Sequence, residues 1–301
     1  MPEPIFKGVI VPLITPFNED YSIDFDGLNW IVNYVIERGV NGIFPYSTTG
    51  EFVHLKPREG IEIVKHVLEN AHGAVKIIPG ISANTTIESI ELGKEMEELG
   101  VDGVITTPPF FFKLKEKHLE YHFSTIARKV DLPIIIYNIP SLTGNPIPVH
   151  IYAKLAKEFS NIVGAKVTYD SVAYIKNLIL ELKSIRPDFS ILTGLDDHFL
   201  NTLILGGDGG IMACANFAPE IHVNLFKAFK EGNYEKAFEY HRKLSQLVRI
   251  YEYASSFPSA IKTVLRLMNA PIKDVVRPPL LKEPEEVIKR IEEVLKTVRV
   301  I

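Results

Sequence analysis

The sequence has little of what marks secreted, membrane-spanning or nucleic-acid-binding proteins. Its 301 residues include one cysteine, Cys214, so no intrachain disulfide can form and nothing indicates an oxidising compartment. It has no run of about 18 apolar residues, so we expect no membrane span. The formal net charge is -4, whereas nucleic-acid-binding proteins usually carry a basic surplus. The start of the chain has no basic segment and its apolar run is broken by prolines, so we expect no signal peptide. These absences favour a cytoplasmic protein that binds neither nucleic acid nor membrane.

Short apolar runs rich in β-forming residues recur along the chain. The first seven begin roughly 27 to 34 residues apart, a period that suits one strand, one helix and their loops. The predicted strands are Gly8–Ile14, Gly42–Ser47, Lys76–Ile81, Gly103–Thr107, Pro133–Asn138, Ile162–Val167, Ser190–Gly194 and Gly209–Ala213. Helical spacing of apolar residues predicts helices at Phe25–Arg38, Arg58–Ala71, Thr86–Leu99, Glu116–Lys129, Val149–Phe159 and Ser171–Ile185. Four more are predicted at Ile221–Glu231, Tyr234–Tyr253, Ser259–Met268 and Pro284–Val298.

Eight βα units in series indicate an α/β protein with a closed (β/α)8 TIM barrel. An open doubly wound sheet would need a glycine-rich phosphate turn after its first strand, and the segment 12–16 carries two prolines there instead. We expect residues 1–220 to form the barrel core. Residues 221–301 are expected to add C-terminal helices that pack on the barrel as one structural unit.

A lysine late in the sixth predicted strand is the clearest candidate for catalysis. Lys166 stands in the apolar stretch Ile162–Val167, near the strand end where such barrels place their active sites. Burial of an ammonium is costly and lowers its pKa, and a neutral amine is the nucleophile of imine chemistry. The alternative is a structural lysine that extends to solvent or pairs with Asp170. Lys76 starts its strand and would lie at the opposite face, so we interpret it as structural.

Polar residues follow three other predicted strands. Tyr137 could move a proton at the catalytic face, or be a core aromatic whose hydroxyl is bonded. The turn around Thr48 and Thr49 could offer backbone N–H groups to a carboxylate, or be an ordinary polar turn. After Gly194, Asp196 and Asp197 could bind substrate hydroxyls, or cap the next helix.

Two further patterns have structural interpretations. The glycines at 206–210 indicate close backbone packing or a tight turn more than a phosphate-binding loop. His118 and His122 have metal-compatible spacing on one predicted helix, but no third ligand is evident. We interpret them as part of a solvated helix face, and we predict no metal and no organic cofactor.

In combination, these segments resemble the dihydrodipicolinate synthase / N-acetylneuraminate lyase family of pyruvate-dependent class I aldolases. The matching pieces span nearly the whole chain and are specific in combination. They are Pro12-Leu13-Ile14-Thr15-Pro16-Phe17, Ser47-Thr48-Thr49-Gly50-Glu51, Tyr137-Asn138-Ile139-Pro140-Ser141-Leu142-Thr143-Gly144, Gly164-Ala165-Lys166-Val167-Thr168, Gly207-Asp208-Gly209-Gly210-Ile211 and Arg277-Pro278-Pro279.

The resemblance implies a role for each matching site residue. Lys166 would form the Schiff base, Tyr137 would donate and accept the proton, and Thr48 would help to relay it. Thr48 and Thr49 would hold the pyruvate carboxylate, and Ile211 would line the pyruvate site. The family also implies a homotetramer.

Three departures from the family pattern bear on the substrate. Leu142 occupies the position of the arginine with which dihydrodipicolinate synthases bind the carboxylate of their second substrate. Phe111 replaces the tyrosine that the family lends across a subunit interface, and Ala213 replaces a serine of the sialate lyases. We therefore favour an aldolase that joins or cleaves pyruvate and an aldehyde, with a 2-keto-3-deoxy sugar acid as substrate. Its predicted contacts are Gly194, Asp196, Asp197 and Thr143. The alternatives are dihydrodipicolinate synthase or N-acetylneuraminate lyase activity, a 2-keto acid dehydratase, or a non-catalytic ligand-binding barrel.

Overall fold

The computed structural model of the protein describes residues 3–301. Eight parallel strands in one curled sheet alternate with helices, and C-terminal helices follow, as the repeating sequence pattern predicts for a (β/α)8 barrel. Every predicted strand is present, most of them shortened at the ends, and β6 has its predicted bounds. The strands are β1 Gly8–Pro12, β2 Gly42–Phe44, β3 Lys76–Ile77, β4 Val104–Thr106, β5 Ile134–Asn138, β6 Ile162–Val167, β7 Ser190–Thr193 and β8 Gly209–Ile211.

The long helices follow the apolar periodicity closely. The barrel helices are α1 Phe25–Glu37, α2 Pro57–Ala71, α3 Thr86–Leu99, α4 Glu116–Ala127, α6 Val149–Glu158 and α7 Val172–Ile185. The C-terminal ones are α9 Pro219–Lys230, α10 Tyr234–Leu247, α11 Ile250–Tyr253, α12 Phe257–Leu267 and α13 Glu285–Val298. α3 shows how caps set such bounds, since Thr85 accepts a hydrogen bond from the N–H of Glu88 and Gly100 ends the helix at φ 73°.

The sequence interpretation was wrong in part about the helices. The stretch predicted as one helix, Tyr234–Tyr253, is broken between Leu247 and Ile250, where no glycine or proline marks the break. Two short helices and three 3-10 turns were not predicted, because they are too short to show a period. They are α5 Pro140–Thr143, α8 Phe199–Ile204, η1 Phe52–His54, η2 Asp196–His198 and η3 Ala213–Asn216.

The chain divides into two compact units. The first combines the N-terminal residues up to Gly8 with Lys76–Ile211, and the second combines Val9–Val75 with Met212–Ile301. The first βα repeats are tied to the chain after β8, since Asn216 Oδ1 accepts from the N–H of Ile14 and the Tyr34 hydroxyl donates to the Phe217 carbonyl.

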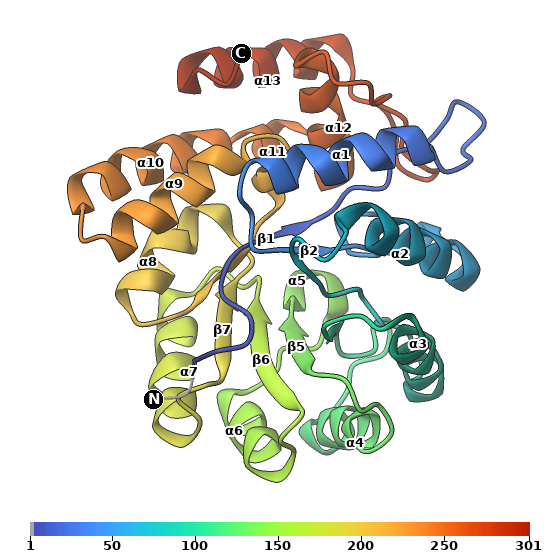
Figure 1. Ribbon diagram of the computed structural model, residues 1–301, viewed down its shortest axis with the longest axis vertical. Coiled ribbons are helices and arrows are strands. Elements are labelled where there is room, and N and C mark those ends of the chain that lie inside the picture. Colours follow the sequence, from blue (N-terminus) through green and yellow to red (C-terminus); the bar gives the residue numbers. More distant parts are fainter. Residues whose placement is uncertain (1–2) are drawn as a thin grey trace. The chain divides into compact units, whose positions relative to one another are not determined.

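In the first unit, β4 to β8 pair in parallel and in sequence order. Figure 1 shows β5, β6 and β7 side by side, with α4, α6 and α7 beside them. All six residues of β6 are buried, including its lysine. The register sets Tyr137 of β5 and Leu192 of β7 level with Lys166, so this lysine lies at the centre of the sheet of this unit.

In the second unit, β1 pairs with β2 in parallel. The C-terminal helices α9 and α10 lie side by side (Figure 1), and α13 packs against α10, α11 and α12. α12 contributes an almost continuous buried surface, because eight successive residues from Pro258 to Leu265 are buried. One of them is a lysine.

The glycine run before β8 packs closely against backbone, which confirms the structural interpretation. A Cβ atom on Gly209 would lie 2.2 Å from the carbonyl oxygen of Gly8, and one on Gly207 would lie 2.9 Å from that of Thr202. Gly206 has φ +96°, a conformation that other residues rarely adopt. Close approach of chains therefore requires these glycines.

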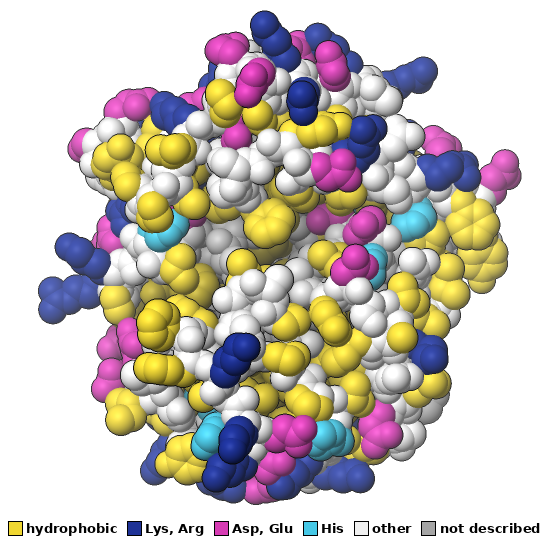
Figure 2. Space-filling view, turned by 180° about the vertical axis from the view of Figure 1, so that it is seen from behind, with side chains coloured by type: hydrophobic (Ala, Val, Ile, Leu, Met, Phe, Trp, Pro, Cys, Tyr) yellow, Lys and Arg dark blue, Asp and Glu magenta, His cyan; other side chains and the backbone are white. Residues whose placement is uncertain are grey.

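Charged side chains of both signs are interspersed on the face shown in Figure 2. Such mixing gives the surface no single-signed field on that face, in keeping with the small net charge. Within residues 3–301, none of the helices combines the length and the apolar character that a membrane crossing would need.

Candidate active site

Lys166 is a buried lysine on β6 whose pKa is strongly lowered. Its side chain is 3% exposed, and its Nζ lies 4.0 Å from the centre of the Tyr137 ring. Burial disfavours the ammonium and lowers the pKa of Lys166 to about 7, against the opposing effect of the Asp196 carboxylate. At neutral pH a large fraction of this amine is therefore in the neutral, nucleophilic form.

The structure supports neither structural alternative for Lys166. Asp170 is exposed and lies 3.1 Å from His198 Nε2, and the lysine side chain does not extend to solvent. Lys76 behaves differently, as predicted. It is exposed, and its Nζ donates to Asp102 at 2.7 Å.

Tyr137 and Thr168 form a hydroxyl pair beside the lysine. Thr168 Oγ1 donates to the Tyr137 hydroxyl at 3.1 Å, which leaves the phenolic proton able to point elsewhere. Gly194 makes room for this pair, since a Cβ there would lie 1.9 Å from Thr168 Oγ1 and 3.1 Å from Lys166 Cε. Thr168 was not predicted as a site residue, although it shares a strand face with Lys166 at a spacing of two. Lysine, phenol and hydroxyl together can hold and move a proton.

The other predicted site residues of the first unit differ in their burial and in their hydrogen bonds. Asp196 is buried in η2 and Asp197 is half-buried, and neither η2 nor α8 has a side-chain cap, so the capping alternative is not supported. Ile211 is buried at the end of β8. Thr143 is buried in α5, where its hydroxyl donates to the Ile139 carbonyl and accepts from the N–H of Asn145. Thr143 could therefore only accept a further hydrogen bond.

The turn with Thr48 and Thr49 belongs to the second unit. The N–H groups of Gly50, Glu51 and Phe52 are bonded to Ser47 Oγ, the Thr48 carbonyl and the Ser47 carbonyl. In the described part of the chain, no hydrogen bond engages the N–H groups of Thr48 and Thr49. Two adjacent open N–H groups are what an anion-binding turn presents to a carboxylate.

A second buried lysine, Lys262 on α12, was not singled out from the sequence. Its side chain is fully buried and its Nζ donates to Glu51 Oε1 at 2.6 Å and to the Val275 carbonyl at 2.8 Å. Burial lowers its pKa to about 8, and Glu51 opposes that shift. Among the described residues, Lys166 and Lys262 are the two buried lysines. Lys262 donates to two partners and has the higher pKa of the two, so Lys166 is the better nucleophile at neutral pH.

The histidine pair on α4 does not form the solvated face that the spacing suggested. His118 is exposed, but His122 is buried between Thr86 and the Thr107 carbonyl. Burial lowers the pKa of His122 to about 4, so the ring is neutral. Its Nε2 must carry the proton, because a carbonyl can only accept. Residues 3–301 contain no group of three or more histidine, cysteine or carboxylate side chains that could hold a metal ion.

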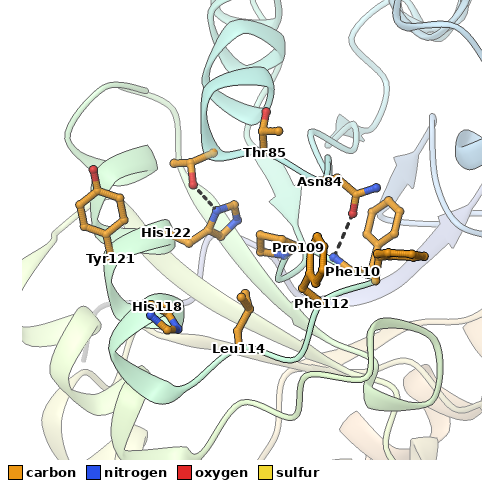
Figure 3. A pocket seen from close by; sticks show the side chains of 11 residues that line it. Asn84, Thr85, Pro109, Phe110, Phe112, Leu114, His118, Tyr121 and His122 are labelled. Atoms are coloured by element: carbon orange, nitrogen blue, oxygen red, sulfur yellow. Dashed lines mark hydrogen bonds between the residues drawn. The ribbon is translucent and has the colours of Figure 1, made fainter.

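A wide pocket of about 500 Å³ lies beside His122 and is lined by aromatic residues. Figure 3 shows Phe110, Phe112, Leu114 and Pro109 around it, with Asn84 Oδ1 bonded to the N–H of Phe110. Phe111 and Phe112 are 88% and 74% exposed. Phe111 also has φ 90°, which is strained for a bulky side chain. An aromatic cluster exposed in this way is typical of an interaction surface.

Comparison with known proteins assigns the chain to a family. The sequence model of the dihydrodipicolinate synthetase family matches residues 5–298. The chain belongs to this family. An uncharacterized DapA-like lyase of Thermofilum pendens is 52% identical over 97% of each chain. A probable 2-dehydro-3-deoxy-D-pentonate aldolase of Escherichia coli, YjhH, is 35% identical over 96% of each chain.

A solved member of the family shares the whole fold. The crystal structure of YagE, a prophage protein of Escherichia coli in complex with pyruvate, is 34% identical, with a TM-score of 0.96 over 99% of this chain and 100% of that one. YagE also bears the name of a putative 2-dehydro-3-deoxy-D-gluconate aldolase. The family consists of lyases and aldolases, and the present protein is one of them.

Proposed function

We propose that the protein is a class I aldolase that cleaves a 2-keto-3-deoxy sugar acid to pyruvate and an aldehyde. The observation that carries the proposal is Lys166, a buried strand lysine with a pKa of about 7 that lies against the Tyr137 ring. Lysine burial of this kind is costly in a structural role and is what imine chemistry requires. The reaction needs no metal, because the protonated imine withdraws electrons.

The residues support an ordered set of steps. The neutral amine of Lys166 attacks the C2 ketone of the substrate, and the carbinolamine loses water to give a protonated imine. Tyr137 supplies and removes protons in this step, with Thr168 hydrogen-bonded to its hydroxyl. Loss of the C4 hydroxyl proton to Tyr137 breaks the C3–C4 bond and releases the aldehyde. The enamine then takes a proton at C3, and water releases pyruvate from Lys166.

The turn with Thr48 and Thr49 is assigned the substrate carboxylate in this proposal. The open N–H groups of Thr48 and Thr49 would hold the pyruvate carboxylate, as the family resemblance implies. The same resemblance gives Thr48 a part in the proton relay, and Ile211 would line the pyruvate site. Gly194 keeps the space beside the Lys166 side chain open.

The proposed substrate class depends on the residues that would contact the part of the substrate released as the aldehyde. Leu142 on α5 is 54% exposed and cannot bind a second carboxylate, which argues against aspartate semialdehyde. Asp196 and Asp197 can accept hydrogen bonds from the hydroxyls of a sugar chain, and Thr143 retains acceptor capacity. The names of YjhH and YagE point to the same substrate class.

We expect 2-keto-3-deoxy sugar acids to be far better substrates than aspartate semialdehyde. A site whose polar groups pair with substrate hydroxyls loses those bonds with other substrates. The measurement is kcat/KM for pyruvate release from 2-keto-3-deoxygluconate and 2-keto-3-deoxypentonates, beside condensation of pyruvate with aspartate semialdehyde. We expect the sugar acids to be preferred by at least about tenfold. A tenfold preference for the semialdehyde would contradict the argument from Leu142 and leave the chemistry of Lys166 intact.

Three other activities and a non-catalytic role either fit the residues of this chain less well or are distinguished by experiment. Dihydrodipicolinate synthase activity would lack the arginine that Leu142 replaces, and N-acetylneuraminate lyase activity would lack the serine that Ala213 replaces. A dehydratase would use the same imine but release water from the substrate, so product analysis in the same assay distinguishes it. In a non-catalytic barrel, the lowered pKa of Lys166 would have no chemical role.

We also propose that the protein assembles as a homotetramer of paired dimers, with Phe111 or a neighbouring phenylalanine at one of its subunit interfaces. The exposure of Phe111 and Phe112 and the strained φ of Phe111 favour a second copy as the partner. The double variant Phe111→Asp/Phe112→Asp should shift light scattering toward smaller species. Leu180→Asp on α7, also at an exposed apolar residue, is the control and should not. A monomeric wild type at micromolar concentration would contradict the proposal.

A further inference from the structure

The buried ion pair of Lys262 and Glu51 joins two distant parts of the chain in the second unit. The two residues are 211 positions apart, and both side chains are fully buried. Each also has a second partner of its own: Lys262 donates to the Val275 carbonyl, and Glu51 Oε2 accepts from the N–H of Arg277 at 2.9 Å. The proposed reaction has no chemical step for either residue.

Arg277 and Phe17 complete the cluster. The Arg277 guanidinium binds both carboxylate oxygens of Glu59, at 2.9 and 2.6 Å. The Phe17 ring lies 4.2 Å from Lys262 Nζ and 4.6 Å from the Arg277 guanidinium, so two cations contact one aromatic ring. Two sequence motifs without a role in the reaction therefore meet at this ion pair, since Phe17 contacts Lys262 and Arg277 contacts Glu51.

Glu51 ends the turn that presents Thr48 and Thr49. It has φ 60°, a left-handed conformation that a glutamate adopts at a cost. The turn is held from its other side by Thr15 Oγ1, which donates to the Gly50 carbonyl at 2.7 Å, and by Ser47 Oγ, which donates to the Leu13 carbonyl at 3.2 Å. Gly50 is packed tightly, since a Cβ there would lie 2.7 Å from the Leu13 carbonyl oxygen.

We infer that Lys262 and Glu51 are positioning residues that hold the turn in the conformation in which the N–H groups of Thr48 and Thr49 bind the carboxylate of the 2-keto acid. A buried ion pair is seldom the most stabilising choice, because apolar side chains of similar volume often fill such a space equally well. The charges of Lys262 and Glu51 add a hydrogen bond of fixed direction, which apolar side chains could not provide. The Glu51 carboxylate is held by an ammonium and a backbone N–H at once, so the left-handed residue and the turn before it are held in one conformation.

The inference rests on the proposed function, and its test separates positioning from stability. The protein variants are Lys262→Met, Glu51→Gln and the double variant Lys262→Met/Glu51→Gln. The control is Arg266→Met, which breaks a partly exposed ion pair with Asp274 on the same helix. Each protein is assayed for its melting temperature and for the concentration of pyruvate that gives half-maximal borohydride labelling of Lys166. The labelling is repeated with 2-butanone, which has the ketone but no carboxylate or other group that could accept from the N–H groups of the turn.

The single variants should lower the melting temperature, because each leaves a buried group without its partner, and the double variant should recover much of that loss. We expect the double variant still to need about tenfold more pyruvate, as befits a weakened charge-assisted hydrogen bond. The concentration of 2-butanone that the double variant needs, and the concentrations of both ketones that Arg266→Met needs, should stay near wild type.

Two results would overturn the inference while leaving the proposed function standing. One is a double variant with a recovered melting temperature and a wild-type pyruvate dependence, which would make the pair purely structural. The other is an equal loss for pyruvate and 2-butanone, which would mean general damage to the site. If wild-type Lys166 is not labelled by either ketone, the proposed function fails and the inference fails with it.

Discussion

Replacing Lys166 with methionine abolishes pyruvate release from every 2-keto acid that the wild type cleaves. Methionine has a similar volume and no amine, so the buried space stays filled while the covalent step is lost. Turnover should fall to the background of a discontinuous assay for pyruvate. Because methionine also removes a costly buried amine, the melting temperature should not fall. A variant that keeps more than about one per cent of wild-type turnover would show that Lys166 is not the nucleophile.

The lowered pKa of the Lys166 amine predicts that the rate of imine formation depends on pH. Lys166 must be neutral to attack, and burial lowers its pKa to about 7. The rate of imine formation at low pyruvate concentration should therefore rise with pH through this range and level off above it. A lysine with its ordinary pKa would give a rate that still rises about tenfold per unit at pH 8 to 9. The control is Lys76→Met, which should leave the midpoint of the profile unchanged because Lys76 is exposed and paired with Asp102.

Replacing Tyr137 with phenylalanine should lower kcat by about 10²–10⁴. The ring that lies 4.0 Å from Lys166 Nζ is retained, and only the hydroxyl that accepts from Thr168 is lost. Imine formation and cleavage of the carbon–carbon bond both need proton transfer, so both should slow. Steady-state kinetics and the rate of borohydride trapping measure the two steps separately.

Tyr174→Phe is the matched control for Tyr137→Phe. The hydroxyl of Tyr174 also lies inside the first unit, where it donates to the Ile147 carbonyl at 2.5 Å. Its loss should cost about 1 kcal/mol of stability and leave kcat within about twofold of wild type. If Tyr137→Phe resembles this control in turnover, another group carries the proton.

The sequence predicted the barrel and the central lysine because both depend on local patterns. Each strand is a short apolar run at a regular interval, and β6 was predicted at its observed bounds. Lys166 stood out as one charge in such a run. Tyr137, its neighbour across the strands, stood out as a polar residue at a strand end. Such contrasts are visible without any knowledge of tertiary contacts.

Features that depend on distant contacts could not be predicted in this way. Nothing in the local sequence of α12 distinguishes Lys262 from a solvent-exposed lysine, and its partner Glu51 is 211 positions away. His122 was assigned to a solvated face because no third metal ligand was evident, but Thr86 and Thr107 from neighbouring elements enclose it. The two-unit division arises from contacts of β1 and α1 with the chain after β8, which no local pattern contains.

The central claim is that Lys166 forms an imine with a 2-keto acid. The most direct measurement is treatment of the wild-type protein with pyruvate and borohydride, followed by digestion and mass spectrometry of the peptides. The account predicts one reduced pyruvate unit per chain, located on Lys166, and no label in the Lys166→Met variant. The other buried lysine, Lys262, serves as an internal control and should stay unmodified. Label on Lys262 or on an exposed lysine, or no label at all, would contradict the account.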